Sequence, residues 1–300
     1  MPLASTGAKA LLFAALALLA AIFLTVWWAT ERRAGTRLRD ATPGPLAIAI
    51  GALTDFLDTL GIGSFAITTS LYKLARVIPD DEIPGTMNVG HAVPTFVEAF
   101  IFIAVIEVDI RTLSLMVAGA ALGAWFGAGV VAGLPRRKIQ LGMGTLLIVA
   151  AGILTVRQLG LVPGGGTAQG LQGGRLVLGV AGNMVLGALM TLGIGLFAPC
   201  MILVAFLGMN ADTAFPIMMG SCAFLMPGAG VRFIRSRRYN LRAAVGLTLG
   251  GLPAVLIAAF IVKQLPLAWV KWLVVGVVVY TAIAMLRSAT LGAKKETKHA

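Results

Sequence analysis

The chain has 300 residues, of which 58% are hydrophobic and only 12% are charged, and its mean hydropathy is +0.93. A soluble domain of this length could not bury so much apolar surface and still cover itself with polar groups, so the composition excludes an ordinary soluble protein. The formal net charge of +12 comes from short basic clusters between apolar runs, without a recognisable nucleic-acid-binding module. This pattern is typical of the Lys and Arg excess in cytoplasmic loops of membrane proteins, and it predicts no nucleic-acid partner.

Runs of about 20 mainly apolar residues predict membrane-spanning helices. The first run, 10–30, is followed by a cluster of four arginines, whereas a cleaved signal peptide carries its positive charge before the apolar run. We therefore expect residues 1–44 to form a retained transmembrane anchor and a basic cytoplasmic loop, with the N-terminus outside. Six further runs are expected to span the membrane: 84–108, 112–134, 139–157, 214–231, 243–262 and 267–287.

Two other apolar stretches, 45–78 and 177–209, are each interrupted in the middle by the same Gly-Ile-Gly tripeptide. A constant shift of 132 residues aligns the string Thr59–Gly63 with Thr191–Gly195, and it also aligns Asp80 with Asp212 and Pro84 with Pro216. These matches predict an internal repeat. The expected organisation is a first repeat over 45–157, a Gly-rich linker over 158–176, a second repeat over 177–288 and a basic tail over 289–300.

The distribution of positive charge predicts the topology. Of the 24 Lys and Arg residues, 18 fall in five segments, 31–42, 73–83, 135–138, 232–242 and the tail from Arg287. If these segments are cytoplasmic, the chain crosses the membrane an even number of times between residues 40 and 135, so that 45–78 enters and leaves from one face. The same count makes 177–209 a hairpin that enters from the outside.

Each repeat is then one re-entrant broken-helix hairpin plus three transmembrane helices, and the odd number of crossings inverts the second copy. We expect an all-α polytopic membrane protein with an inverted-topology repeat, an architecture typical of secondary transporters. The expected location is the inner membrane, with the C-terminus in the cytoplasm. A broken or strongly tilted spanning helix is the alternative for each interrupted stretch.

The two hairpin tips are candidate binding sites. In each hairpin the second half-helix begins just after the glycines, near Ser64 and Leu196, and its free N–H groups and positive dipole end would face the membrane midplane. Such a helix end favours an anion, although the glycines could instead serve close helix packing. The predicted substrate-binding residues at the tips are Gly61, Ile62, Gly63, Ser64, Gly193, Ile194 and Gly195.

Polar side chains also recur along the segment after Pro84. Asn88, His91, Thr95 and Glu98 share one helical face, and an ionisable residue inside a membrane is costly enough to indicate a function. His91 could donate a hydrogen bond to an anion or take a proton, or it could bond to a neighbouring helix. Glu98 is expected nearer the outer end, where Arg111 or water could pair with it.

Thr86, Asn88, His91, Ser221 and Cys222 complete the predicted substrate-binding set. Ionised carboxylates would repel an anion, so Asp55, Asp58 and Glu98 are assigned to a coupling or structural role. No nucleophile–base pair, Walker loop or metal-ligand spacing occurs, and Cys200 and Cys222 lie within apolar stretches. The sequence therefore predicts no enzymatic activity, no cofactor, no metal and no disulfide.

The two Gly-Ile-Gly hairpins, with the segments Ile83–His91 and Phe215–Cys222, resemble the paired motifs of the sulfite exporter TauE/SafE family of anion permeases. The resemblance covers about residues 45–288 and omits the first helix. Many members continue the glycine motif, whereas Ser64-Phe65 and Leu196-Phe197 follow it here. The resemblance implies export or import, without ATP, of sulfite, of sulfonates such as sulfoacetate, or of other small organic or sulfur-containing anions.

The function expected from these observations is that of a secondary transporter, an exporter of a small sulfur-containing or organic anion, working by alternating access. Coupling to protons and efflux driven by the membrane potential both remain open. One alternative is a channel-like importer of a sulfur species that uses Cys200 and Cys222, and another is a membrane scaffold or sensor that transports nothing. Besides the anion, the expected partners are membrane lipids, contacted by the basic segment 232–242, and a second copy in a homodimer.

Overall fold

The computed structural model describes residues 2–79, 81–131, 136–159, 166–190, 196–264 and 267–296, which are helical apart from loops and one isolated bridge between Ala168 and Met209. The α-helices are α1 (Pro2–Arg33), α2 (Pro45–Thr59), α3 (Ser64–Ala75), α4 (Ile83–Gly90), α5 (Ala92–Val105), α6 (Ile110–Val131), α7 (Arg136–Gln158), α8 (Gly173–Met190), α9 (Phe197–Phe206), α10 (Ala214–Ser236), α11 (Leu241–Gln264) and α12 (Leu267–Glu296). Two short 3-10 turns, η1 (Leu38–Asp40) and η2 (Ala211–Thr213), complete the described elements. The prediction of an all-α protein is confirmed.

Five helical segments among the described residues are long and apolar enough to cross a bilayer. They are Gly7–Arg33, Ile83–Val105, Gly173–Met190, Ala211–Ser236 and Leu241–Ile261. The second of them combines α4 and α5, which are separated only at His91. The described residues of the runs predicted at 112–134, 139–157 and 267–287 lie in α6, α7 and α12. The chain is thus a multi-pass helical membrane protein.

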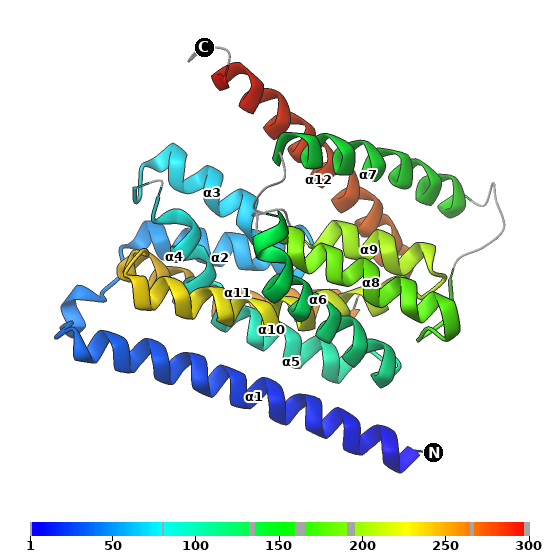
Figure 1. Ribbon diagram of the computed structural model, residues 1–300, viewed down its shortest axis with the longest axis horizontal. Helices are drawn as coiled ribbons and strands as arrows, with labels where there is room; N and C mark the ends of the chain where they lie inside the picture. Colours follow the sequence, from blue (N-terminus) through cyan, green and yellow to red (C-terminus); the bar gives the residue numbers. More distant parts are fainter. Residues whose placement is uncertain are drawn as a thin grey trace.

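Helices α2 and α3 form a hairpin whose open end lies beside the start of α11 (Figure 1). Near the start of α2, Ala47 packs against Gly246, and near the end of α3 the Tyr72 hydroxyl donates to the Ala243 carbonyl oxygen at 3.4 Å. The chain reverses at Gly61 and Gly63, whose φ values of 89° and 90° suit glycine far better than any residue with a Cβ. The stretch 45–78 therefore folds as a hairpin and not as a broken spanning helix.

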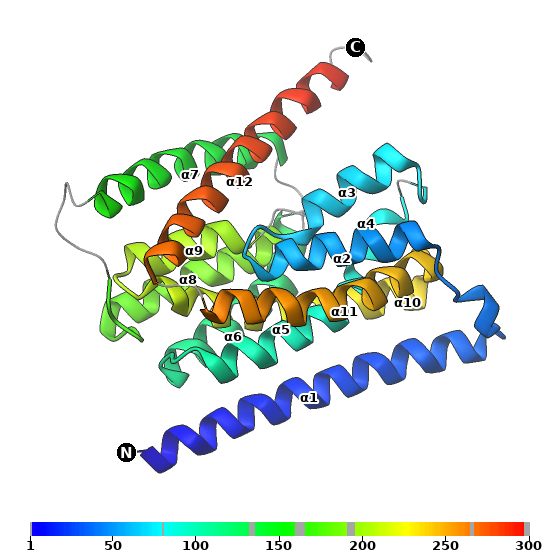
Figure 2. The ribbon, with the colours of Figure 1, turned by 180° about the vertical axis from the view of Figure 1, so that it is seen from behind.

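Helices α8 and α9 open toward the opposite end of the molecule (Figure 2). The backbone after α9 returns to the segment before α8, where the Asn210 N–H donates to the Ala168 carbonyl oxygen at 2.8 Å. Helix α8 begins at Gly173, four residues before the predicted start of this stretch. The predicted tip, Gly193-Ile194-Gly195, lies outside the described residues.

The helices of the two predicted repeats pack across one another. Helix α2 lies along α11, and α8 lies along α6. A Cβ added at Gly250 of α11 would fall 1.9 Å from the Ile48 carbonyl oxygen, and one at Gly187 of α8 would fall 2.0 Å from that of Ala120, so glycine permits both close approaches. Under the 132-residue shift, α2 corresponds to α8 and α11 corresponds to α6, so the two pairings are equivalent, as expected for an inverted repeat. The repeat itself stays a prediction.

Helix α1 runs along the side of the bundle, and its last turn is fastened to the turn between α10 and α11 (Figure 1). Glu31 Oε1 accepts hydrogen bonds from Arg237 Nη1 at 2.6 Å and from the Tyr239 hydroxyl at 2.5 Å. Burial, together with the adjacent Glu31 carboxylate, raises the pKa of the Tyr239 phenol, which also accepts a bond from Trp27 Nε1 at 3.0 Å. The basic segments 31–42 and 232–242 therefore meet at one end of the molecule.

Candidate functional site

Four ionisable side chains gather inside the bundle near the tip of the α2–α3 hairpin. Asp55 and Asp58 come from α2, His91 from the junction of α4 and α5, and Glu98 from α5. Their exposed fractions are 0%, 4%, 0% and 0%, so none of them meets bulk solvent. Charged groups at this depth require partners, because leaving one unpaired in an apolar medium is costly. We refer to these four residues as the tip cluster.

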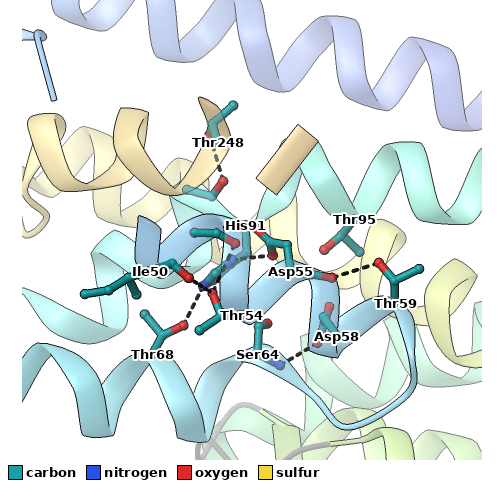
Figure 3. Close-up of polar contacts among 12 residues, drawn as sticks. Ile50, Thr54, Asp55, Asp58, Thr59, Ser64, Thr68, His91, Thr95 and Thr248 are labelled. Carbon is teal, nitrogen blue, oxygen red and sulfur yellow. Dashed lines mark hydrogen bonds and ion pairs between the residues drawn. The ribbon is translucent and has the colours of Figure 1, made fainter. Parts of the chain in front are cut away.

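Asp55, His91 and Thr68 form a chain of hydrogen bonds that joins three helical segments (Figure 3). The His91 Nδ1 atom lies 2.6 Å from Asp55 Oδ1, and its Nε2 atom lies 3.0 Å from the Thr68 hydroxyl oxygen. The carboxylate therefore orients the ring, and Thr68 can accept from Nε2 when the imidazole is protonated or donate to it when it is neutral. The arrangement can hold or release a proton without moving the backbone.

The position of His91 follows from a break in the backbone hydrogen bonds. Pro94 has no N–H, so the Gly90 carbonyl oxygen lacks its usual helical partner. The Thr248 hydroxyl of α11 donates to that oxygen at 2.7 Å and satisfies it. Since a freed backbone carbonyl inside a membrane needs such a partner, α11 fixes the junction at which His91 stands.

The side chain of Asp58, a residue of α2, caps the N-terminus of α3. The N–H of Ser64, the first residue of α3, donates to Asp58 Oδ1 at 2.5 Å (Figure 3). Gly63, at the N-cap position, has no side chain to provide this bond. The helix end that the sequence predicts to be an anion site thus holds an anionic group of the chain itself.

Glu98 faces the hairpin tip, where its Oε1 atom accepts a 2.6 Å bond from the Thr59 hydroxyl. The expectation that Glu98 pairs with Arg111 or water near the outer end is wrong, because α5 packs with this side chain turned into the bundle. Two carboxyl oxygens of the tip cluster, Asp55 Oδ2 and Glu98 Oε2, have no hydrogen-bond partner in the described part of the chain. Asp55 Oδ2 lies against Gly251 of α11, where an added Cβ would be only 1.9 Å away.

The charges of the tip cluster do not balance. Three carboxyl groups surround one imidazole, and the groups that shift or pair with these carboxyls are one another, His91, Ser64 and Thr59. The described residues also contain no group of three or more His, Cys, Asp and Glu side chains arranged to hold a metal ion. The cluster is therefore suited to binding protons, since full ionisation would leave uncompensated negative charge in a buried place.

The family model of the sulfite exporter TauE/SafE proteins matches residues 2–154, just over half of the chain. The chain belongs to the sulfite exporter TauE/SafE family. The match spans α1 to α6 and most of α7, so it contains the α2–α3 hairpin and all four residues of the tip cluster. It includes the first helix, which the motif resemblance omits. Among curated proteins and solved structures, none matches the chain.

Membership of the TauE/SafE family makes this chain a membrane transporter of the anion-permease kind and not an enzyme. The family predicted from the glycine motifs is thereby confirmed. Among the described residues, most of the buried ionisable side chains lie in the matched region, including the four of the tip cluster.

The predicted substrate-binding residues of this TauE/SafE member fall into three groups: those near the tip cluster, those outside the described residues, and those that make their hydrogen bonds elsewhere. The tip residues Gly61, Ile62, Gly63 and Ser64 lie beside the tip cluster, of which His91 is a part. Cys222 is close enough to interact electrostatically with Asp58 and Glu98, and its thiol lies 3.7 Å from Met190 Sδ. Gly193, Ile194 and Gly195 lie outside the described residues.

Three predicted residues make their hydrogen bonds elsewhere. The Thr86 hydroxyl donates to the Glu82 carbonyl oxygen at 2.8 Å and accepts from the Asn240 N–H at 2.9 Å, near the start of α11. Asn88 donates to the Pro84 carbonyl oxygen at 2.9 Å. Ser221 accepts a 2.9 Å bond from Asn183. The structure does not bring these three side chains into the hydrogen bonds of the tip cluster.

Sequence reasoning missed Asn183, Thr248 and Gly251. Asn183 is fully buried and donates to the Met116 carbonyl oxygen as well as to Ser221, and a lone amide within an apolar run is a signal that could have revealed it. Thr248 and Gly251 leave no such signal. Their roles depend on which helix lies against α11, and this is known only from the fold.

Proposed function

We propose that this TauE/SafE transporter exports a small sulfur-containing or organic anion, such as sulfite or sulfoacetate, across the inner membrane by alternating access. The observation that carries the proposal is the hairpin tip, which ends inside the bundle next to buried ionisable groups. Non-helical backbone at such depth is tolerated where it is covered by protein or lines a polar cavity. A tip of this kind is where discontinuous helices of secondary transporters bind their substrates.

The contacts of the tip support a site between the two halves of the chain. A Cβ added at Gly61 would lie 2.2 Å from Met201 Cε of α9 and 3.4 Å from Met218 Cε of α10. The tip of the first half is thus covered by two methionines of the second half, whose flexible side chains can repack when the halves move. Such a movement would open the tip first to one side of the membrane and then to the other.

The proposed anion is held by backbone N–H groups at the start of α3, around Gly63 and Ser64, with His91 as a further donor. Asp55, Asp58 and Glu98 supply the proton coupling in this proposal. The basic end formed by segments 31–42 and 232–242 would face the cytoplasm and its anionic lipids, with the N-terminus outside. The description of the family as sulfite exporters supports the proposed outward direction of transport, which the substrate experiment tests.

Uptake of labelled sulfite and sulfoacetate into proteoliposomes tests the substrate. We expect saturable uptake by the unmodified chain and its loss in Gly63→Leu, because a leucine at φ 90° costs about 1–3 kcal/mol of backbone strain and fills the anion's approach. No described atom lies within 4 Å of a Cβ at either Gly63 or Gly152, and Gly152 is an exposed helical residue of α7. Gly152→Leu is therefore the matched control and should transport normally.

The result has three informative outcomes once size-exclusion chromatography shows that each variant is folded. Uptake lost only in Gly63→Leu supports the tip as the anion site. Uptake that survives in Gly63→Leu contradicts the tip site but leaves the substrate standing. Absence of uptake of both anions by the folded, unmodified chain contradicts the proposed substrate class. Orientation-selective efflux from loaded vesicles then measures the direction.

A further inference from the structure

We propose that Asp58 acts as a tethered substitute for the transported anion. In the anion-free protein its carboxylate holds the N-terminus of α3. When the Asp58 carboxylate takes up a proton, its side chain moves away from the Ser64 N–H group. The substrate anion then takes its place at that N–H group. Proton uptake and anion binding would then be coupled at one site. This inference rests on the proposed function and adds to it the way in which proton uptake and anion binding are coupled.

The first support is that the helix end already binds an anionic group. Asp58 Oδ1 accepts from the Ser64 N–H at 2.5 Å, and Asp58 stands six residues before the helix it caps. A cap usually comes from the residue next to the helix, but here that residue is Gly63. The bond is possible only because the chain reverses at the tip. An oxyanion from solution would use the same N–H group and the same positive helix end.

The second support is the surplus of negative charge around Asp58. The ionisable groups near it are Asp55 of α2, His91 of the α4–α5 junction, Glu98 of α5 and Cys222 of α10, with Cys200 of α9 and Tyr72 of α3 beyond them. Only the imidazole can be positive, and Asp55 already holds it. A substrate anion that entered beside an ionised Asp58 would add a further negative charge, and repulsion at such short range in a dry interior is strong. The substrate therefore requires that a carboxylate be neutralised first.

The third support is that an acceptor for the proton of a protonated Asp58 lies close by. The Glu98 and Asp58 carboxyl groups lie within hydrogen-bonding reach of each other, and the Glu98 Oε2 atom is fully buried without a donor among the described residues. A protonated carboxyl group can donate to such an oxygen, whereas an ionised one cannot. The proton from water thus comes to rest on the Asp58 carboxyl and is shared with Glu98. The Ser64 N–H is released to the incoming anion.

The mechanism predicts how transport is driven. One proton accompanies each anion, so a monovalent anion crosses with no net charge. For a monovalent anion the membrane potential then does no work on the loaded carrier, and the anion gradient and the pH difference set the direction. Sulfoacetate, whose sulfonate and carboxylate are both ionised at neutral pH, would still cross with one net negative charge. Of the two driving forces that the sequence left open, proton coupling is the one that the geometry of Asp58 favours.

Binding of sulfoacetate to the purified full-length protein, measured by titration calorimetry across neutral pH, tests the inference. The affinity of the unmodified chain should weaken as pH rises, by up to about tenfold per pH unit once Asp58 ionises, because one proton is linked to one anion. Asp58→Asn should bind with an affinity that no longer depends on pH, since the amide carries no competing charge. Asp40→Asn, an exposed aspartate of η1, is the control and should keep the slope of the unmodified chain.

A second measurement does not depend on any variant. Calorimetry of the unmodified chain in buffers of different ionisation enthalpy counts the protons taken up, and about one proton per bound anion is expected from the linkage. Binding without proton uptake, or an Asp58→Asn protein that keeps the pH slope, would overturn the role of Asp58 and leave the transporter assignment intact. Failure of the folded, unmodified chain to bind at any pH would overturn the proposed substrate, and this inference with it.

Discussion

Gly251 of α11 gives the Asp55 carboxylate the space it occupies, and Gly251→Ala removes that space. The new Cβ would lie 1.9 Å from Asp55 Oδ2 and 2.7 Å from Pro94 Cγ. Asp55 can avoid the collision only by rotating, which breaks its 2.6 Å contact with His91. Breaking a buried pair of this kind costs about 3–5 kcal/mol, while alanine favours the helix by about 1 kcal/mol. The expected loss in the free energy of unfolding is therefore about 2–4 kcal/mol.

The measurement is the free energy of unfolding in mixed micelles, followed by tryptophan fluorescence as a denaturing detergent is added. Gly276→Ala makes the same change in α12, where no described atom lies within 4 Å of the new Cβ, so it should be neutral or stabilising by up to about 1 kcal/mol. The reasoning would be refuted by a Gly251→Ala protein that is as stable as this control and whose sulfoacetate affinity depends on pH as that of the unmodified chain does. It would show that Asp55 is not confined between His91 and α11.

Two further predictions concern the backbone of the junction and the cysteines. Thr248→Val leaves the Gly90 carbonyl oxygen without a partner and should cost about 1–3 kcal/mol in the same unfolding assay, whereas Thr248→Ser should restore most of the loss because its hydroxyl can donate again. Replacing both Cys200 and Cys222 by Ser should leave anion uptake near that of the unmodified chain, since the proposed site uses backbone N–H groups. Uptake abolished in that folded double variant would instead favour the channel-like importer.

The hairpin and the polar face could be predicted because each leaves a local pattern in the sequence. Gly61 and Gly63 interrupt an apolar run, and His91, Thr95 and Glu98 recur at helical spacing. In the structure the two glycines have φ values of 89° and 90°, and the three polar side chains are buried. Helical periodicity fixes which side chains share a face, whichever helix covers that face.

The partners of these side chains could not be predicted, because distant segments or the closure of the hairpin determine them. The bond from Ser64 to Asp58 depends on how tightly the tip closes, and the bond from Thr59 to Glu98 depends on where α5 crosses it. Thr248 lies 158 residues from the Gly90 carbonyl oxygen that it satisfies. Spacing in the sequence carries no information about such contacts. The Asp58 carboxylate at the expected anion site could therefore not be predicted.

The predicted repeat makes the chemistry of the two halves unequal. Under the 132-residue alignment, Asp55, Asp58, His91 and Glu98 correspond to Gly187, Met190, Ala223 and Gly230, so the second half has no ionisable group at any of these positions. The ionisable groups thus belong to one half, and the methionines that cover its tip belong to the other. In the proposed cycle, relative movement of the halves would change the hydration of the carboxyls and hence their ionisation. That is the property a proton-coupled carrier requires, because Asp58 must lose its proton and return to Ser64 on the side where the anion leaves.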